Sequence, residues 1–538
     1  MKLPFKFKPT PIEDIVGEAI AQVLPDHGKP WYKVKHLLAL NTLLIVPLLS
    51  AASFGYDGSL MNGLQSMEEW RLEFGYPRGT MLGFVNAAMS IGGIVALPFS
   101  GYLSDNLGRR LTLAIGLIGI IAGTIIQATS INIAQLIASR FVVGIAGLFT
   151  TQPAPLLVAE LSFPTFRGKM TCLYWAFYFV GAIVASWLCF GCTGRGDAWA
   201  WRIPTILQAA FPIVQLTFLF LVPESPRWLV SKGRVNEARK TLVKFHAGGE
   251  NDSPLVETEL LEISNALEME KSANQTSWKA FVATPGNRKR TYIAITLGLS
   301  SQWCGTPVVS FYLTLVLNTI GITSSYMQTL INGFLQVFNF FFSTLAALLV
   351  DFFGRRFLFL WSGIGMLISF IIWTICSAIF EQSGSVAAGR TVVGFIFIFF
   401  FHYDMAYTPL LLGYPTEIFP YSMRSKGVSL VLVTTFVSLF ILAFCNSIAM
   451  DNIGWRYYIV FCVNLVFIVL NAYFFFPETK GYSLEEIAVL FDGLEVTDLE
   501  ALMSKEHIGM IDVDELEEQL TDKRNVLFEH LERTSRSS

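Results

Sequence analysis

Apolar and polar positions divide the chain into two groups of six long apolar runs, with a polar, charged segment between them. Each run is about 20 residues long, the length that a helix needs to cross a bilayer. The first group covers residues 37–55, 80–103, 111–129, 133–157, 169–191 and 203–222, and the second covers 291–318, 325–350, 357–380, 388–414, 427–449 and 455–476. The pattern predicts an all-α membrane protein with twelve transmembrane helices.

The same pattern divides the chain into five parts. They are an N-terminal tail (1–36), a six-helix half (37–222), a linker with amphipathic helices (223–290), a second six-helix half (291–476) and an acidic tail (477–538). We expect the first span to be retained as the targeting signal, because no apolar segment with a cleavage site precedes it.

Composition agrees with a membrane protein and excludes several other classes. Of the 538 residues, 53% are hydrophobic and 15% are charged, and a net charge of −3 is too small to suggest a nucleic-acid partner. The seven cysteines are scattered and have no metal-binding spacing. We expect no metal and no cofactor. An enzyme is also not expected, because neither the tails nor the linker carries a nucleotide loop or a catalytic triad.

Lysine and arginine in the short loops predict the orientation of the helices. Basic residues occur at 109–110, 167–169, 355–356 and 424–426, whereas the loops near 130, 320 and 381–387 lack them. Short cytoplasmic loops are the ones rich in basic residues. Both termini and the linker are therefore expected in the cytoplasm, and the protein in the plasma membrane.

Four motifs occur once in each half, in the same order and at a nearly constant offset. Asp105-x-x-Gly-Arg-Arg recurs from Asp351, Arg140-x-x-x-Gly from Arg390, Glu160 with Arg167 as Glu417 with Arg424, and Pro-Glu224-Ser as Pro-Glu478-Thr. Six spans per half restore the orientation, so the halves are expected to be parallel repeats. This pattern is typical of transporters that bind their substrate near the membrane midplane, between the halves.

Most of the repeated charged residues fall at helix ends that are predicted to be cytoplasmic. The preference for basic residues inside explains the arginines but not the acids, because that rule does not depend on acids. We expect these side chains to pair across the two halves and to close the cytoplasmic side when the protein opens outward. The expected gate comprises Asp105, Arg109, Glu160, Arg167, Glu224, Arg227, Asp351, Arg355, Glu417, Arg424 and Glu478.

An aspartate closes the first apolar run, in the segment Phe54-Gly-Tyr-Asp57-Gly. A carboxylate within hydrocarbon costs roughly 2.5–3.5 kcal/mol on insertion scales. Such a residue needs a partner, a water-filled cavity or a function. We interpret Asp57 as a proton carrier beside a cavity that the other helices form.

As a set, these motifs resemble the sugar porter family of the major facilitator superfamily. The resemblance rests on Gly55-Tyr-Asp57, the two Asp-x-x-Gly-Arg-Arg motifs, Arg140 with Gly144, Pro223-Glu-Ser-Pro-Arg-Trp, residues 414–420 and Pro477-Glu-Thr-Lys-Gly. It covers nearly all of the chain except the tails. Residues 55–65 and 331–336 are similar to the fungal lactose and cellodextrin permeases.

The resemblance implies roles for individual positions. In proton-coupled members the aspartate of this motif pairs with an arginine of the fourth helix, and Asp57 and Arg140 hold these positions. The alternative is a static structural pair. Asp404, in the tenth predicted span, is interpreted either as a second protonatable group or as a structural partner.

The substrate site implied by the resemblance combines an aromatic ring with amides. Phe54, Gln302 and Asn339 match family positions, while Trp175 and Thr435 stand where many members carry amides; Tyr312 is expected to help to close the outer side. The alternative for the amides is hydrogen bonding between helices. A site with few amides favours a larger glycoside over a simple hexose.

These observations predict a proton-coupled sugar symporter that works by alternating access as a monomer, with a disaccharide or oligosaccharide as substrate. The alternatives are an uncoupled facilitator, a porter of a hexose, polyol or other small glycoside, or a sugar receptor on a transporter scaffold. The expected partners are the sugar, the proton and the lipid bilayer.

Overall fold

The computed structural model describes residues 18–25, 28–274, 278–349, 353–480, 487 and 490–492, and every regular element among them is a helix. The first half holds α3 (Lys35–Ser66), α5 (Gly79–Leu107), α6 (Arg109–Ala128), α7 (Ile133–Thr151), α8 (Pro153–Leu161), α9 (Arg167–Cys192), α10 (Trp199–Leu207) and α11 (Ala210–Leu219). The second half holds α16 (Pro285–Trp303), α17 (Thr306–Asn318), α18 (Ser325–Leu349), α19 (Arg355–Ser383), α20 (Val386–Ile418), α21 (Tyr421–Ile453) and α22 (Tyr458–Phe475).

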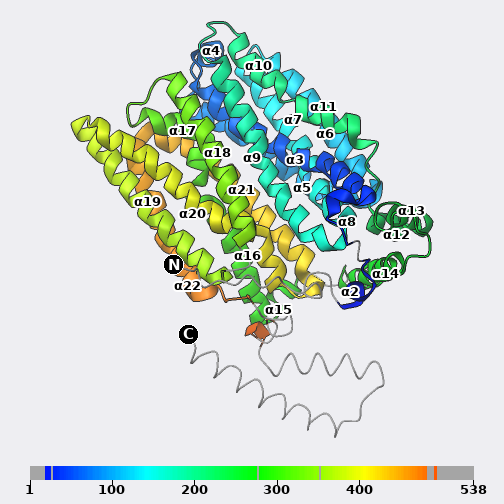
Figure 1. Cartoon of the computed structure of the whole chain (residues 1–538). Coiled ribbons are helices and arrows are strands. Elements are labelled where there is room, and N and C mark those ends of the chain that lie inside the picture. Colours follow the sequence, from blue (N-terminus) through cyan, green and yellow to red (C-terminus); the bar gives the residue numbers. More distant parts are fainter. Residues whose placement is uncertain are drawn as a thin grey trace.

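Shorter helices lie at the two ends of this bundle. The linker forms α12 (Pro226–Ser231), α13 (Val235–Phe245), α14 (Pro254–Asn274) and α15 (Ala280–Ala283). Near the N-terminus lies α2 (Glu18–Val23), and α4 (Glu68–Glu73) follows α3 at the opposite end. We call the end that carries α12–α15 the linker end, and the end that carries α4 the loop end (Figure 1). Three 3₁₀ turns, Trp31–Lys33, Pro164–Phe166 and Gly454–Tyr457, complete the described elements.

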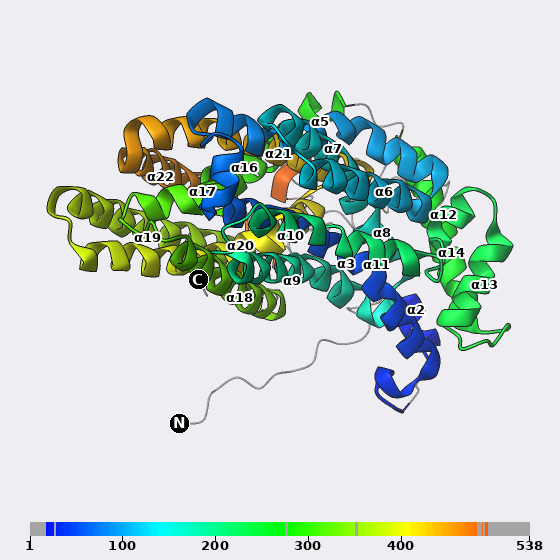
Figure 2. The same cartoon turned by 90° about the horizontal axis from the view of Figure 1, so that it is seen from above.

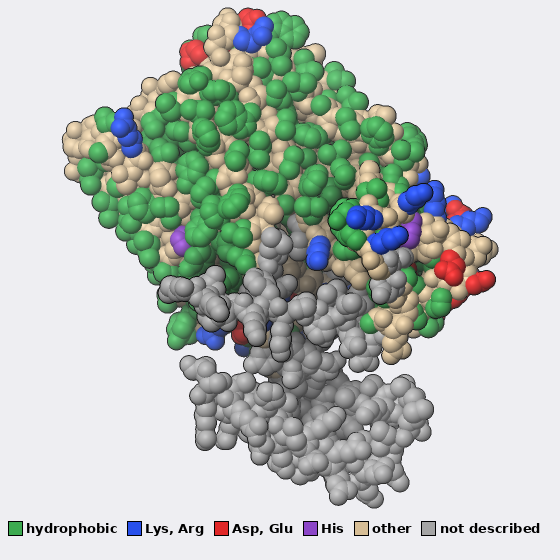
Figure 3. Space-filling view, viewed as in Figure 1, with side chains coloured by type: hydrophobic (Ala, Val, Ile, Leu, Met, Phe, Trp, Pro, Cys, Tyr) green, Lys and Arg blue, Asp and Glu red, His purple; other side chains and the backbone are tan. Residues whose placement is uncertain are grey.

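The prediction of twelve membrane-spanning helices is confirmed. Among the described residues, ten helical segments are long and apolar enough to cross a membrane, and the last of them, Lys426–Phe475, includes most of α21 and all of α22. The remaining predicted span is divided into α16 and α17 at Gly305. Figure 3 shows apolar side chains covering the side of the bundle, with charged side chains gathered toward its two ends. This is the surface that a lipid bilayer requires.

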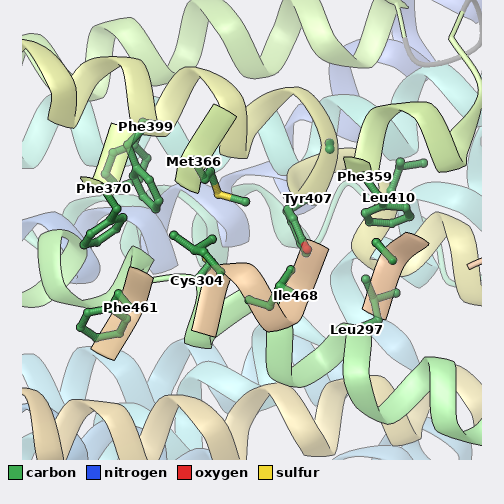
Figure 4. Packing of buried hydrophobic residues seen from close by; sticks show 14 of the residues in the cluster. Leu297, Cys304, Phe359, Met366, Phe370, Phe399, Tyr407, Leu410, Phe461 and Ile468 are labelled. Carbon is green, nitrogen blue, oxygen red and sulfur yellow. The ribbon is translucent and has the colours of Figure 1, made fainter. Parts of the chain in front are cut away.

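The two groups of six spans lie side by side, and the linker helices lie at the edge of the first group (Figure 2). Each half has its own buried core. In the second half, Phe370 meets Phe399 edge to face at 5.1 Å between ring centroids, and Met366, Tyr407 and Ile468 continue the cluster (Figure 4). The linker has a separate core around Trp228, Leu242 and Val256.

Glycines allow two pairs of helices in the first half to approach closely. A Cβ on Gly55 of α3 would lie 1.8 Å from the carbonyl oxygen of Tyr178 in α9, and one on Gly181 of α9 would lie 1.8 Å from the oxygen of Ala52. Likewise, a Cβ on Gly144 of α7 would lie 2.1 Å from the oxygen of Met89 in α5. Small residues serve this purpose in membrane helices, where van der Waals contact drives association.

Candidate functional site

Asp57 and Arg140 form an ion pair inside the first half. Arg140 Nη1 donates to Asp57 Oδ1 at 2.8 Å, and both residues are at most 1% exposed. Removing two charges from water costs several kcal/mol per ion unless further hydrogen bonds compensate for the loss. The predicted contact between these side chains is therefore present in the structure.

A glutamine that was not predicted completes the environment of Asp57. Gln208 Nε2 donates to the same Oδ1 atom at 2.9 Å, from the point where α10 ends and the sixth span bends toward α11. The second oxygen of Asp57 and the Nε of Arg140 have no hydrogen-bond partner among the described residues. The pair is thus only partly satisfied, and one face of the carboxylate is left for another donor or a proton.

Close packing of α7 on α5 places the arginine. Gly144 lies one turn after Arg140 and allows α7 to contact the backbone of Met89, and Arg140 Nη2 lies 3.7 Å from the sulfur of the same residue. The equivalent arginine of the second half, Arg390, is exposed, and a Cβ on Gly394 would meet no atom within 4 Å. The repeated motif therefore buries an arginine in the first half alone.

A small cavity lies beside this pair, between the two halves. Phe54, Gly58 and Tyr178 line it from the first half, and Phe311 and Phe436 line it from the second. Its volume of about 40 Å³ holds a water molecule or two but no sugar. Substrate binding at this place requires the halves to move apart.

The structure distributes the predicted substrate residues over several helices. Phe54 lines the cavity, whereas Trp175 packs against the core of the first half. Gln302 is half-buried and bonds to Ser301, and Thr435 is half-buried and bonds to a carbonyl of its own helix. Tyr312 is fully buried, and its hydroxyl donates to the carbonyl of Ala443. Of the six predicted substrate residues, Phe54 is the one that lines the cavity.

The sixth, Asn339, belongs to a row of amides on α18. Asn332, Gln336 and Asn339 are all at least nine-tenths buried and recur at the spacing of one helix face. Asn332 donates to Ser59 of α3 at 3.1 Å and accepts from Gln336 at 3.2 Å, while Asn339 Oδ1 has no partner in the described part of the chain. The row therefore links the two halves and ends in a free acceptor.

Asp404 is a second buried carboxylate, in α20. Its Oδ1 accepts from Thr408 at 3.0 Å, and its Oδ2 has no hydrogen-bond partner among the described residues. This contact joins two residues of the same helix, so it does not by itself choose between a protonatable group and a structural partner.

At the loop end, Asn62 of α3 closes the seam against a break in α17. Tyr312 departs from helical geometry, with φ −136° and ψ 26°. Asn62 Nδ2 donates to the carbonyls of Val309 and Ser310 at 3.1 and 2.7 Å, and its Oδ1 accepts from the amide of Leu313 at 3.2 Å. One amide side chain thus satisfies backbone groups that the broken helix leaves, as membrane interiors require.

Gln65 extends this contact by donating to the carbonyl of Phe311 at 3.0 Å. No role for Asn62, Gln65 or Gln208 was predicted from the sequence. A signal was present for Asn62, because Ser59, Asn62 and Ser66 share one face of α3 within a stretch too polar to face lipid.

At the linker end of the first half, the repeated charged residues pair with one another. Arg109 donates to Glu160 at 3.2 Å and to Asp105 at 3.3 Å. Glu224 accepts from the backbone amides of Arg109 and Arg110 at 3.2 and 3.1 Å and so caps the N-terminus of α6. Burial raises the pKa of Glu224, and these amides oppose the shift.

The second half repeats this arrangement. Arg355 pairs with Glu417 at 3.0 Å, and Glu478 accepts from the amides of Arg355 and Arg356 at 2.7 and 3.1 Å to cap α19. A Cβ on Gly354 would lie 2.2 Å from Glu478, and one on Gly108 would lie 2.5 Å from Glu224. The glycine of each motif therefore leaves room for the capping carboxylate.

In each of the two clusters described above, the charged residues pair with residues of the same half or the segment that follows it. None of these particular contacts joins the two halves. Arg167 is exposed at the start of α9, and Arg227 and Arg424 are half-buried. Asp351 lies outside the described residues. The cross-half pairing expected of these residues when the protein opens outward stays a prediction, because here the loop end is closed by Asn62 and Gln65.

The model of a family described as "Sugar (and other) transporter" matches residues 43–491, most of the chain. The chain belongs to this family. Members include the low-affinity glucose transporter HXT1 of Saccharomyces cerevisiae, 28% identical over 88% of this chain and 84% of that one. The MFS-type transporter oryC of Aspergillus oryzae is 30% identical over 86% of this chain and 88% of that one.

Solved structures show the same fold. The xylose transporter XylE of Escherichia coli, in a partially occluded inward-open conformation, aligns with a TM-score of 0.70 at 23% identity, covering 82% of this chain and 99% of that one. The chain therefore has the major facilitator fold, as predicted from the sequence. The named relatives are transporters, so this member is a multi-pass membrane transporter and not an enzyme.

Proposed function

We propose that the protein is a proton-coupled sugar symporter that works by alternating access. The single observation that carries this proposal is the buried pair of Asp57 and Arg140, with one carboxylate oxygen unpartnered, in the helix whose Phe54 and Gly58 line the cavity between the halves. Placing an ionisable residue within the membrane costs free energy, and such residues commonly have a function.

The pair suggests how a proton is exchanged. The guanidinium of Arg140 attracts a negative charge on the carboxylate, and this attraction is strong in a low-dielectric interior. Movement of α3 against α7 would separate them, and a carboxylate without its cation is better accommodated when protonated. Proton binding by Asp57 would then be coupled to the movement of the helices.

Coupling in this way would drive accumulation. One proton entering with each neutral sugar adds about 2.3 kcal/mol per 100 mV of membrane potential. Since 1.36 kcal/mol corresponds to a factor of ten, this is roughly a fifty-fold concentration ratio.

For the substrate, we propose a disaccharide or oligosaccharide. The motifs at 55–65 and 331–336, which resemble fungal lactose and cellodextrin permeases, support this choice, and part of the second motif is the amide row of Asn332 and Gln336. Phe54 would stack on the sugar ring, and Asn339 and Gln302 would bond its hydroxyls once the cavity opens. Trp175, Thr435 and Tyr312 are proposed as further contacts of this opened site.

A second candidate is an uncoupled hexose facilitator. It is favoured by the names of two relatives from different yeasts, HXT1 and the high-affinity glucose transporter of Kluyveromyces lactis, which is 29% identical over 86% of this chain. In that case the pair of Asp57 and Arg140 would be a static brace between α3 and α7.

We also propose that the protein lies in the plasma membrane, with the linker end and both termini in the cytoplasm. The five parts of the chain would meet at residues 36, 222, 290 and 476. Basic residues concentrate at the linker end, which supports the orientation. The charged clusters of Arg109 and Arg355 would pair across the seam when the loop end opens. The protein would function as a monomer, because both halves come from one chain.

The test is uptake by vesicles that contain the full-length protein, with a panel of labelled sugars, with and without an inward proton gradient. Wild-type protein should accumulate one sugar only with the gradient, and Asp57→Asn should lose accumulation while exchange of that sugar persists. If the sugar equilibrates across the membrane at the same rate with and without the gradient, and in both wild type and Asp57→Asn, the protein is an uncoupled facilitator. No movement of any sugar would overturn the proposal and favour a receptor.

A further inference from the structure

A second pocket opens at the loop end and shares no lining residue with the cavity beside Asp57. Its volume is about 180 Å³. Trp70, Arg71 and Tyr76 line it from α4 and the loop that follows, while Asn318 and Asp451 line it from the ends of α17 and α21. The pocket is therefore built from both halves, at the place where Asn62 and Gln65 already join them.

The lining combines aromatic rings with polar groups of both signs. Arg71 and Arg78 provide positive charge and Asp451 provides negative charge, so the pocket does not select an ion of one sign. Aromatic faces accept the C–H side of a sugar ring, and charged and amide groups bond hydroxyls. This composition is that of a small-molecule pocket with a few placed polar groups.

Three buried polar atoms of lining residues lack a hydrogen-bond partner among the described residues. They are Gln65 Oε1, an acceptor, and Trp70 Nε1 and Arg71 Nε, which are donors; Gln65 is 4% and Trp70 is 1% exposed. A buried polar group without a partner costs roughly 1–3 kcal/mol. An inorganic anion could bond only the two donors, whereas hydroxyl groups bond both the donors and the acceptor.

Backbone strain marks the same pocket. Tyr76 has φ +53° and is the one non-glycine residue with positive φ in the described part of the chain. This region is costly for a bulky side chain, and such strain persists at sites where the surrounding structure holds it. Here the tyrosine hydroxyl donates to Glu68 and its amide donates to the carbonyl of Arg71 at 2.7 Å, so the ring is fixed at the pocket wall.

We propose that this pocket binds a neutral polyhydroxylated molecule, a mono- or disaccharide, from the side of the membrane opposite the linker. Because both halves form the walls, the site is complete only while the loop end is closed. A ligand that binds one conformation shifts the population toward it. Sugar at high concentration would then hold the loop end shut and slow its own uptake.

The predicted effect on uptake rests on the proposed function, whereas sugar binding to the pocket does not, because binding is measured without transport. Hydrogen exchange of the segment 66–79 would be followed in the full-length protein in lipid nanodiscs, with glucose, maltose and sodium sulfate as separate probes. We expect either sugar to slow exchange several-fold and sulfate to have no effect. Protection by sulfate alone would overturn the proposal, as would no protection by either sugar at high millimolar concentration.

Two variants test the pocket without threatening the fold. Tyr76→Gly removes the ring and suits the positive φ, and Asp451→Asn keeps the size of an exposed side chain. Each should weaken sugar protection by roughly tenfold, the effect of losing one good contact. Leu72→Ala, on the exposed face of α4, is the matched control and should leave protection unchanged. Equal protection in all four proteins would overturn the assignment.

Uptake then separates this proposal from the previous one. Initial rates in wild-type vesicles should rise and then fall as outside sugar increases, and Asp451→Asn should shift the fall to roughly tenfold higher sugar concentrations. Sugar protection of 66–79 in a protein that moves no sugar would sink the transport proposal and leave this pocket standing. Sugar transport without protection of 66–79 would overturn the assignment of this pocket and leave the transport proposal standing.

Discussion

At the scale of single residues, the glycine of a repeated motif packs closely in the copy that buries its arginine and not in the other copy. Both halves carry Arg-x-x-x-Gly, but a Cβ on Gly144 would meet Met89 at 2.1 Å, and one on Gly394 would meet nothing within 4 Å. We expect Gly144→Ala to push α7 from α5 and to destabilise the protein by about 1–3 kcal/mol, as overpacking does. The thermal midpoint of the purified protein in detergent measures this effect.

Gly394→Ala is the control that the repeat itself supplies. The same substitution at the equivalent position of the second half should leave the midpoint unchanged or raise it slightly, because alanine favours a helix over glycine. Equal losses in the two variants would mean that the close approach of α7 and α5 does not depend on Gly144.

The environment of Asp57 could be predicted from the sequence only in part. A carboxylate within an apolar run demands a partner, and the family resemblance named Arg140. Gln208 was not predicted, because its contact depends on the bend between α10 and α11, which brings an amide from 151 residues away to Asp57 Oδ1. An amide in an apolar run has many possible partners until the helix packing is known.

At the scale of helices, α3 and α17 depend on each other at the loop end. Hydropathy ended the first span at residue 55, but α3 continues to Ser66, since its polar residues face the second half and not water. Proline within a helix is a common cause of a kink. The seventh span instead breaks at Gly305 and distorts at Tyr312, while Pro409 and Pro415 lie inside the continuous α20. Periodicity cannot foresee a helix break that another helix satisfies.

Asn62 is therefore expected to hold the loop end closed. Asn62→Ala removes its bonds to the carbonyls of Val309 and Ser310, which become free to bond water only when the halves separate. Two hydrogen bonds at about 1 kcal/mol each would shift the balance toward the open loop end by roughly tenfold or more. Distances between spin labels on α4 and α21 would report the shift.

Asn452→Ala is the matched control, because this exposed amide lies at the same end and donates only to its own helix, at Ile448. Its distance distribution should equal that of the wild type. An unchanged distribution in Asn62→Ala would mean that other contacts, such as Ser325 with Ser66, are enough to close the seam.

At the scale of the whole molecule, the repeated charged motifs now have a structural account. In each half a carboxylate caps the helix that follows the glycine, and a second carboxylate pairs with the first arginine. The sequence showed that these residues belong together and at which end they lie. It could not show whether they pair within or between halves, because pairing depends on which helices are neighbours in a given conformation.

A buried pair within the linker also contacts the first half. His246 Nδ1 lies 2.8 Å from Glu259, and its Nε2 lies 3.2 Å from the carbonyl of Leu161, the last residue of α8. Both side chains are less than 5% exposed. Glu259→Ala leaves the buried histidine without its hydrogen-bond partner, and a buried polar group left unpaired costs about 1–3 kcal/mol. We expect amide hydrogens of α13 and α14 to exchange faster while α3 and α5 stay protected.

Glu250→Ala, on an exposed position of the same linker, should leave exchange of α13 and α14 unchanged. A double variant, His246→Leu with Glu259→Leu, should recover most of the protection, because replacing both partners of a buried hydrogen bond with apolar groups of similar shape costs little. Faster exchange throughout the first half in Glu259→Ala would contradict a local role. It would mean that the linker core and the transmembrane core unfold together, although Trp228, Leu242 and Val256 form a cluster of their own.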